Sequence, residues 1–124
     1  MGYREFSFEG LEVYQAARLL VRDIYRLQQK FPKTEIYAHG DQIIRSASSV
    51  TSNIAEGSGR KSNKEKVHFI EIAYGSLMEA FSQLQIAQDL GYLTELDIDT
   101  IRPQFISVAK MLSGLKKHFE MVMG

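Results

Sequence analysis

The apolar residues of this chain recur at alternating spacings of four and three, which is the period of an amphipathic helix. The first series covers residues 13–31, and Pro32 is expected to end that helix. A shorter series covers residues 43–54, where Asp41 is the expected N-cap and Gly57 the expected C-terminal glycine. The apolar positions of these two helices are Val13, Ala17, Leu20, Ile24, Leu27, Phe31, Ile43, Ala47, Val50 and Ile54.

Two more helical series follow. The third begins with Ser62-x-x-Glu65, a capping-box pattern, and runs to Gly91, which predicts the longest helix. The fourth covers residues 98–122 and crosses Pro103, so we expect that helix to kink near residues 99–103 or to start just before Pro103. Their apolar positions are Ile70, Ala73, Leu77, Ala80, Leu84 and Ala87, then Ile98, Ile101, Phe105, Val108, Leu112, Leu115, Phe119 and Val122.

These four segments predict an all-α fold. No stretch keeps the alternation of a strand for more than a few residues. Four amphipathic helices joined by short turns must bury their apolar stripes together, so residues 1–124 are expected to form one domain, an antiparallel up-down four-helix bundle. The small side chains of the second helix allow a close neighbour, and Gly75 within the third helix predicts a tight crossing there.

The third helix carries more apolar surface than one bundle needs. Apolar side chains cover much of its circumference, and a helix of that kind is usually buried on more than one side. We therefore expect a homo-oligomer, although scattered exposed apolar residues are an alternative explanation for two or three of these positions. The predicted interface residues are Phe69, Ile72, Gly75, Ser76, Ile86 and Leu90.

Composition excludes some functions and leaves others open. The 124 residues include no cysteine, which rules out a disulfide framework and a thiolate metal site and fits a reducing compartment. No apolar run approaches the ~20 residues needed to span a bilayer. A cytoplasmic protein without a membrane segment is expected.

Charge is balanced overall but uneven along the chain. Fifteen basic and fifteen acidic residues cancel, so the whole-chain charge gives no support for nucleic-acid binding. Residues 16–66, however, hold ten basic and five acidic residues, and a ladder at every fourth position of the first helix could follow a phosphate backbone. A second basic cluster surrounds the start of the third helix, where free amides also favour anions. Ordinary solvated surface is the alternative for both. The candidate nucleic-acid-binding residues are Arg18, Arg22, Arg26, Lys30, Arg45, Arg60, Lys61, Lys64 and Lys66.

Nothing in the sequence predicts an enzyme. The histidines His39, His68 and His118 lack the helical spacing of a metal site, apart from His68 with Glu71, which would need inward carboxylates on other helices. The glycine-rich turn at residues 57–61 has neither the Walker spacing nor a preceding strand. No catalytic residue, metal ligand or cofactor is predicted.

Several short motifs together resemble a known bacterial family. The matching residues are Phe31-Pro32-x-x-Glu35-x-Tyr37, Gln42-Ile43-x-Arg45-Ser46-Ala47, Ser49-Val50-x-Ser52-Asn53-Ile54-Ala55-Glu56-Gly57-x-Gly59-Arg60, Ala73-x-Gly75-Ser76-Leu77-x-Glu79, Leu90-Gly91-Tyr92 and Met111-Leu112-x-x-Leu115. In these motifs the chain resembles the four-helix-bundle proteins encoded in intervening sequences of large-subunit ribosomal RNA genes. It departs from the usual family pattern at Ala38-His39 and at Thr51.

The resemblance implies a fold and a set of partners. It implies a four-helix bundle, and related accessory proteins of diversity-generating retroelements form homopentamers that bind nucleic acid and a reverse transcriptase. Those relatives are markedly basic, whereas this chain is neutral. The expected function is therefore a non-enzymatic homo-oligomeric scaffold, a pentamer by resemblance, for RNA, DNA or a nucleic-acid enzyme. The alternative is a self-associating protein adaptor that contacts no nucleic acid.

Overall fold

The computed structural model describes residues 6–123, and every regular element in this range is helical. A short 3₁₀-helix, η1 (Ser7–Gly10), precedes α1 (Glu12–Gln28). One helical turn, α2 (Lys33–Glu35), and a π-helical turn, η2 (Ile36–Gly40), then lead into α3 (Asp41–Ser58). The chain continues through α4 (Asn63–Asp89) to α5 (Glu95–Met123).

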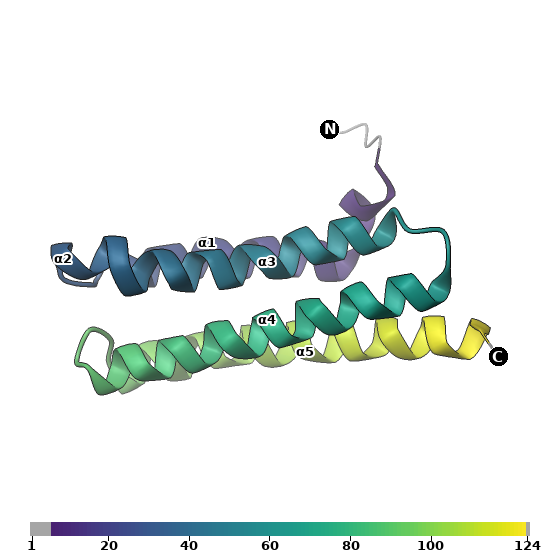
Figure 1. Ribbon diagram of the computed structural model, residues 1–124. Helices are drawn as coiled ribbons and strands as arrows, with labels where there is room; N and C mark the ends of the chain where they lie inside the picture. The colour runs from purple at the N-terminus through teal and green to yellow at the C-terminus, as the bar shows by residue number, and fades with distance from the viewer. Residues whose placement is uncertain (1–5, 124) are drawn as a thin grey trace.

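The four long helices form an antiparallel bundle, as the sequence predicts. α3 packs against α1 and α4, and α5 packs against the same two helices, so the four surround one core. Successive long helices run in opposite directions, and η1 and the end of α5 lie at the same end of the bundle as the α3–α4 connection (Figure 1). No helix in the described range is both long and apolar enough to cross a membrane.

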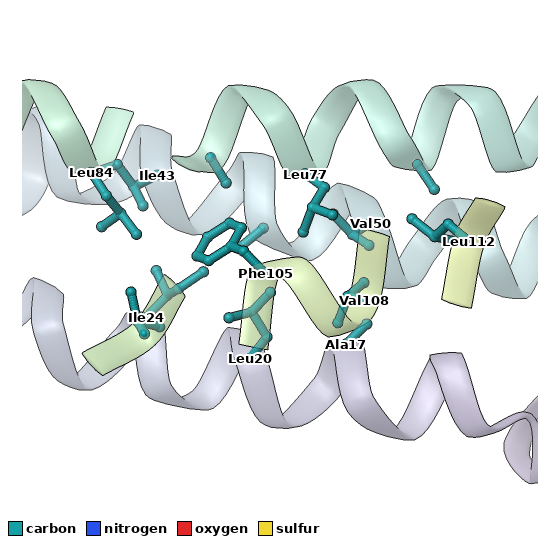
Figure 2. Close-up of a cluster of buried hydrophobic side chains, with 14 of the residues drawn as sticks. Ala17, Leu20, Ile24, Ile43, Val50, Leu77, Leu84, Phe105, Val108 and Leu112 are labelled. Carbon is teal, nitrogen blue, oxygen red and sulfur yellow. The ribbon is translucent and has the colours of Figure 1, made fainter. Parts of the chain in front are cut away.

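The core consists of the predicted apolar stripes. Side chains of all four long helices point into it (Figure 2), and nearly all of the predicted positions up to Leu112 are buried. Leu27 is an exception, being only partly buried. Beyond Leu112 the stripe of α5 is less covered, because Leu115 and Phe119 are half-buried and Val122 is exposed. The core is thus tightly closed in its middle and looser at the end that carries the α3–α4 connection.

The connection between α1 and α3 differs from the prediction. Asp41 is not an N-cap, because the chain is already helical from Lys33 onward and Gly40 itself has helical dihedral angles. This connection wraps around the buried side chain of Gln28, whose Nε2 donates to the carbonyl oxygen of Ile36 at 3.3 Å. A Cβ atom on Gly40 would lie 2.7 Å from Cγ of Gln28, so a larger residue there would force the Gln28 side chain to shift.

The close approach of α3 and α4 also lies elsewhere than predicted. Gly57 does not terminate α3 but lies inside its last turn, where a Cβ atom would be 2.7 Å from Cβ of Phe69 on α4. Gly75, where the sequence suggested a tight crossing, is exposed, and a Cβ atom there would meet nothing within 4 Å. The tight crossing at Gly75 is therefore wrong, and Gly57 takes that role.

The ends of α4 follow the sequence signals. Ser62 is the N-cap, since its Oγ accepts from the backbone N–H of Glu65 at 3.1 Å. At the other end Gly91 has a φ of 83°, the left-handed conformation that favours glycine, and the N–H of Tyr92 donates to the Ala87 carbonyl.

One of the two alternatives predicted for α5, a start just before Pro103, is wrong. This helix begins at Glu95 and runs without interruption through Pro103, so the late start is excluded and α5, with 29 residues, is longer than α4, with 27. A capping box fixes the start, because Thr94 Oγ1 accepts from the Asp97 N–H at 3.1 Å and Asp97 Oδ2 accepts from the Thr94 N–H at 2.9 Å. Pro103 faces solvent.

Candidate interaction surfaces

The basic ladder of α1 is exposed as predicted, but most of its charges are paired. Asp23 lies within the ladder and accepts from Arg22 and Arg26, each at 3.2 Å. At the C-terminal end of the ladder, Lys30 forms an ion pair with Asp97 of α5. Arg18 lies over the ring of Tyr14, 5.9 Å from its centroid. Three of the four cations therefore have a carboxylate partner within the same chain.

Asp23 and Asp97 are held in the charged form that this pairing requires. Burial by itself raises the pKa of Asp23, but hydrogen bonds from Gln104 and Arg22 and the nearby arginine charges outweigh it, so the pKa lies below its usual value. Burial likewise raises the pKa of Asp97, and the contacts from Lys30 and Thr94 lower it further than burial raises it. At neutral pH the ladder is a surface of mixed charge.

The basic cluster at the α3–α4 connection divides into two pairs. Arg60 bonds to Glu56 at 2.7 Å and lies 4.7 Å from the ring centroid of Phe69. Lys66 donates through Nζ to the carbonyl oxygen of Ser58 at 3.0 Å. These two residues hold the connection in place.

Lys61 and Lys64 are the other pair. Both are exposed, and neither has a carboxylate within ion-pair distance in the described part of the chain. Arg45 is exposed in the same way, but it lies thirteen residues before the end of α3, about 20 Å away at 1.5 Å per residue. The structure thus brings Lys61 and Lys64 together and leaves Arg45 apart.

The predicted interface residues of α4 do not share one groove, because Ile86 and Leu90 lie beside α3 whereas Gly75 lines a groove between α4 and α5. Phe69 packs against Gly57, and Ser76 shares a 2.9 Å hydrogen bond with Ser49, so these two are partly used within the chain. The remaining four are exposed on the single chain: Ile72, Gly75, Ile86 and Leu90, with exposed fractions of 38% for Ile72, 48% for Ile86 and 50% for Leu90.

A cavity lies between α3 and the C-terminal part of α4. Ile86 and Leu90 line a cavity of about 240 Å³ together with His39, Gln42 and Ile43. Because these partners belong to η2 and α3, Ile86 and Leu90 lie beside α3. We call the exposed residues Ile72, Ile86 and Leu90 the α3-side strip.

A second apolar strip lies on the other flank of α4. Tyr74 and Met78 of α4 are exposed and line a groove against α5 with the exposed Ile106. The sequence pattern places Tyr74 and Met78 beside the core stripe, but Ile106 was missed because it falls outside the three-four series of its helix. We call Tyr74, Met78 and Ile106 the α5-side strip.

One polar pair escaped the sequence analysis. His39 Nδ1 lies 2.8 Å from Glu35 Oε2, one helical turn away. The prediction that His39 has no carboxylate at helical spacing was therefore wrong, because Glu35 lies four residues before it and both residues are helical. Burial and the neighbouring Glu35 carboxylate raise the pKa of Tyr92.

In the described part of the chain, no carboxylates from other helices join His68 and Glu71 to complete a metal site. Glu71 instead pairs with Lys116 at 3.2 Å. Within the described range no three histidine, cysteine, aspartate or glutamate side chains gather as a metal site would require.

Comparison with known proteins assigns the family. The model of the 23S rRNA-intervening sequence protein family matches residues 9–114, and the chain belongs to that family. A search of curated proteins finds no match. The family membership agrees with the resemblance seen in the sequence motifs and with the four-helix structure.

Proposed function

We propose that this member of the 23S rRNA-intervening sequence protein family is a non-enzymatic, homo-oligomeric interaction module. The observation that carries the proposal is the pair of apolar strips on the two flanks of α4. Exposed apolar side chains that gather in strips usually mark a protein contact. A chain that buries both strips against further copies of itself would remove them from water.

The positions of the strips favour one mode of assembly. The two strips differ in composition and lie on different edges of the bundle, one beside α3 and one beside α5. Contact between the α3-side strip of one copy and the α5-side strip of the next is a head-to-tail interface, and such interfaces close into rings when the rotation permits. A ring is also what the resemblance to pentameric relatives implies.

The mass of the particle in solution tests this proposal. Sedimentation velocity should give a particle several times the 14.1 kDa of one chain. Leu90→Glu should dissociate it, because a carboxylate cannot be buried in an apolar contact without a partner. Leu19→Glu is the matched control, since Leu19 on α1 has the same exposed fraction of 50% as Leu90 but lies outside both strips.

Two outcomes would contradict the proposal. One is a wild-type protein that sediments as a monomer at every concentration. The other is equal dissociation by Leu90→Glu and Leu19→Glu, which would mean that added charge rather than position matters. Circular dichroism of each variant should retain the helical spectrum, since both positions are on the surface.

Contact with nucleic acid is a second candidate function, favoured by the position of Lys61 and Lys64. These two exposed cations lie at the N-terminal end of α4, whose dipole adds to their attraction for phosphate. A ring would repeat the pair once in each subunit and so raise avidity for a polyanion. Such a ring could hold RNA, DNA or an enzyme that acts on them.

Titration of labelled RNA and DNA at low and high salt separates this function from that of a pure protein adaptor. Phosphate contact must weaken steeply as salt rises. Lys61→Ala with Lys64→Ala should reduce binding at low salt, whereas Arg22→Ala with Arg26→Ala should change it less, because those arginines are already paired with Asp23. Absence of salt-sensitive binding in the wild type would favour the adaptor.

A further inference from the structure

A cavity of about 200 Å³ lies at the end of the bundle that carries the α3–α4 connection. It is walled by residues from η1, the start of α1, and α3, α4 and α5, and its lining is mainly apolar. The side chains that matter here are Leu11, Ile54, Ile70, Leu115, Phe119 and Lys66. None of these belongs to the two strips on α4, so the cavity is separate from the proposed subunit contacts.

The cavity is part of the core that remains unfilled. Ile54 and Ile70 on its inner wall are almost fully buried, whereas Leu115 and Phe119 on its outer wall are only half-buried. Protein interiors are close-packed, with few voids larger than a water molecule. An apolar cavity of about 150 Å³ stays dry and holds benzene, so this one has room for a short alkyl chain or a single ring.

One charged side chain lines the cavity. The Lys66 ammonium lies 5.8 Å from the centroid of the Phe119 ring and donates to the Ser58 carbonyl oxygen at 3.0 Å. An ammonium group has three hydrogens to donate, which leaves two for another acceptor. None of the ion pairs in residues 6–123 involves Lys66. The cavity thus combines apolar walls with one cation that lacks a counter-charge.

We propose that this cavity binds a small amphipathic carboxylate of the medium-chain fatty acid type. The alkyl chain occupies the space between Ile54, Ile70 and Leu115, and the carboxylate accepts hydrogen bonds from Lys66. A single negative charge matches a single lysine, and an apolar tail matches walls that offer few hydrogen bonds. The inference goes beyond the proposed function, because it concerns neither subunit contacts nor the Lys61 and Lys64 pair.

Calorimetric titration of the full chain with hexanoate, heptanoate and octanoate tests the apolar part of the site. Affinity should rise roughly fourfold for each added methylene, the factor expected for moving one methylene out of water, and should stop rising once the cavity is full. Octanol, which has the same tail without the charge, should bind more weakly than octanoate. An affinity that does not depend on chain length would overturn the proposal.

Two lysine variants test the charged part. Lys66→Met keeps an apolar stem and removes the ammonium, so octanoate should bind roughly tenfold more weakly while octanol binds as before. Lys64→Met is the matched control, because Lys64 is exposed two residues away and does not line the cavity. Equal loss in both variants, or none in either, would contradict a role for Lys66.

A filling variant locates the tail. Leu115→Phe adds volume on the half-buried outer wall and should weaken octanoate and octanol alike. If that variant loses its helical circular dichroism, the lysine pair still decides the question. Sedimentation of the wild type with and without octanoate should give the same particle mass, which keeps a failure of this site distinct from a failure of self-association.

Discussion

The two glycines Gly57 and Gly75 have opposite surroundings, and alanine at each position should reveal the difference. Gly57 lies where a Cβ atom would be 2.7 Å from Cβ of Phe69, a contact that cannot be relieved by rotating a flexible side chain. Gly75 lies on the exposed face of α4, where an added Cβ atom meets nothing within 4 Å. Gly57→Ala should therefore force α3 and α4 apart, whereas Gly75→Ala should not disturb the chain.

The expected free energies follow from two opposing effects. Alanine is preferred over glycine inside a helix by up to about 1 kcal/mol. Overpacking of a close contact costs about 1–3 kcal/mol. Gly75→Ala gains only the first effect, so its free energy of unfolding should rise by about 0.5–1 kcal/mol. At Gly57 the two effects oppose, and the free energy of unfolding should fall by about 0–2 kcal/mol.

Urea denaturation followed by circular dichroism at two protein concentrations measures both variants. The two concentrations separate folding stability from subunit association, because Gly75 belongs to the predicted interface. Gly75→Ala should be more stable than Gly57→Ala by about 1–3 kcal/mol. If Gly57→Ala proved as stable as Gly75→Ala, the close approach of α3 and α4 at Phe69 would be refuted.

Three further substitutions test the helix ends and the charged pairs. Pro103→Ala should raise the free energy of unfolding by about 1–3 kcal/mol, because it restores an amide hydrogen on the exposed face of α5; a lower melting temperature would contradict this. Gly91→Ala should lower it by about 1 kcal/mol in urea denaturation, because φ at Gly91 is 83°. Asp97→Asn should make the free energy of unfolding decrease less as the pH is lowered, which the urea midpoint from pH 3 to 7 measures. Because the pKa of Asp97 is held below its usual value of 3.8, its carboxylate stabilises the fold above that pH, and this contribution is lost as the pH falls through the lowered pKa.

The buried stripes could be predicted because they depend on a local period. Residues such as Leu20, Ile43 and Leu77 lie at three-four spacings, and that spacing alone places them on one face of a helix. Burial of such a face needs only another apolar face nearby, so four stripes were enough to predict the bundle and its core.

The glycines and the proline could not be interpreted from the sequence in this way. Whether Gly57 or Gly75 lies at the close contact depends on what stands opposite, and Phe69 opposite Gly57 is a tertiary fact. Pro103 was expected to kink its helix or to mark its start, but the capping box of Thr94 and Asp97 starts α5 earlier, and the missing bond at Pro103 faces water. The capping box of Thr94 and Asp97, not Pro103, therefore marks the start of α5.

The α1–α3 connection shows the same limit for a polar pair. Pro32, Gly40 and Asp41 are turn signals in the sequence, yet the chain is helical from Lys33 and packs against the buried Gln28. Only in that helical state do Glu35 and His39 come one turn apart. The Glu35–His39 pair thus depends on the helical conformation of residues 33–40.

Basic and acidic residues are unevenly distributed along the chain. Residues 16–66 hold a surplus of basic residues and residues 67–109 a surplus of acidic residues, but α1 packs directly against α5. Lys30 therefore meets Asp97 across a separation of 67 residues, and Gln104 of α5 donates to Asp23 within the ladder. These contacts reduce the net positive charge of the ladder, and Lys61 and Lys64 are among the exposed cations that have no ion pair in the described residues. A neutral chain of this kind would need several copies in one particle to hold a polyanion, so nucleic-acid binding should depend on self-association. Leu90→Glu should therefore lose self-association and nucleic-acid binding together. Lys61→Ala with Lys64→Ala should lose nucleic-acid binding and leave the particle mass unchanged.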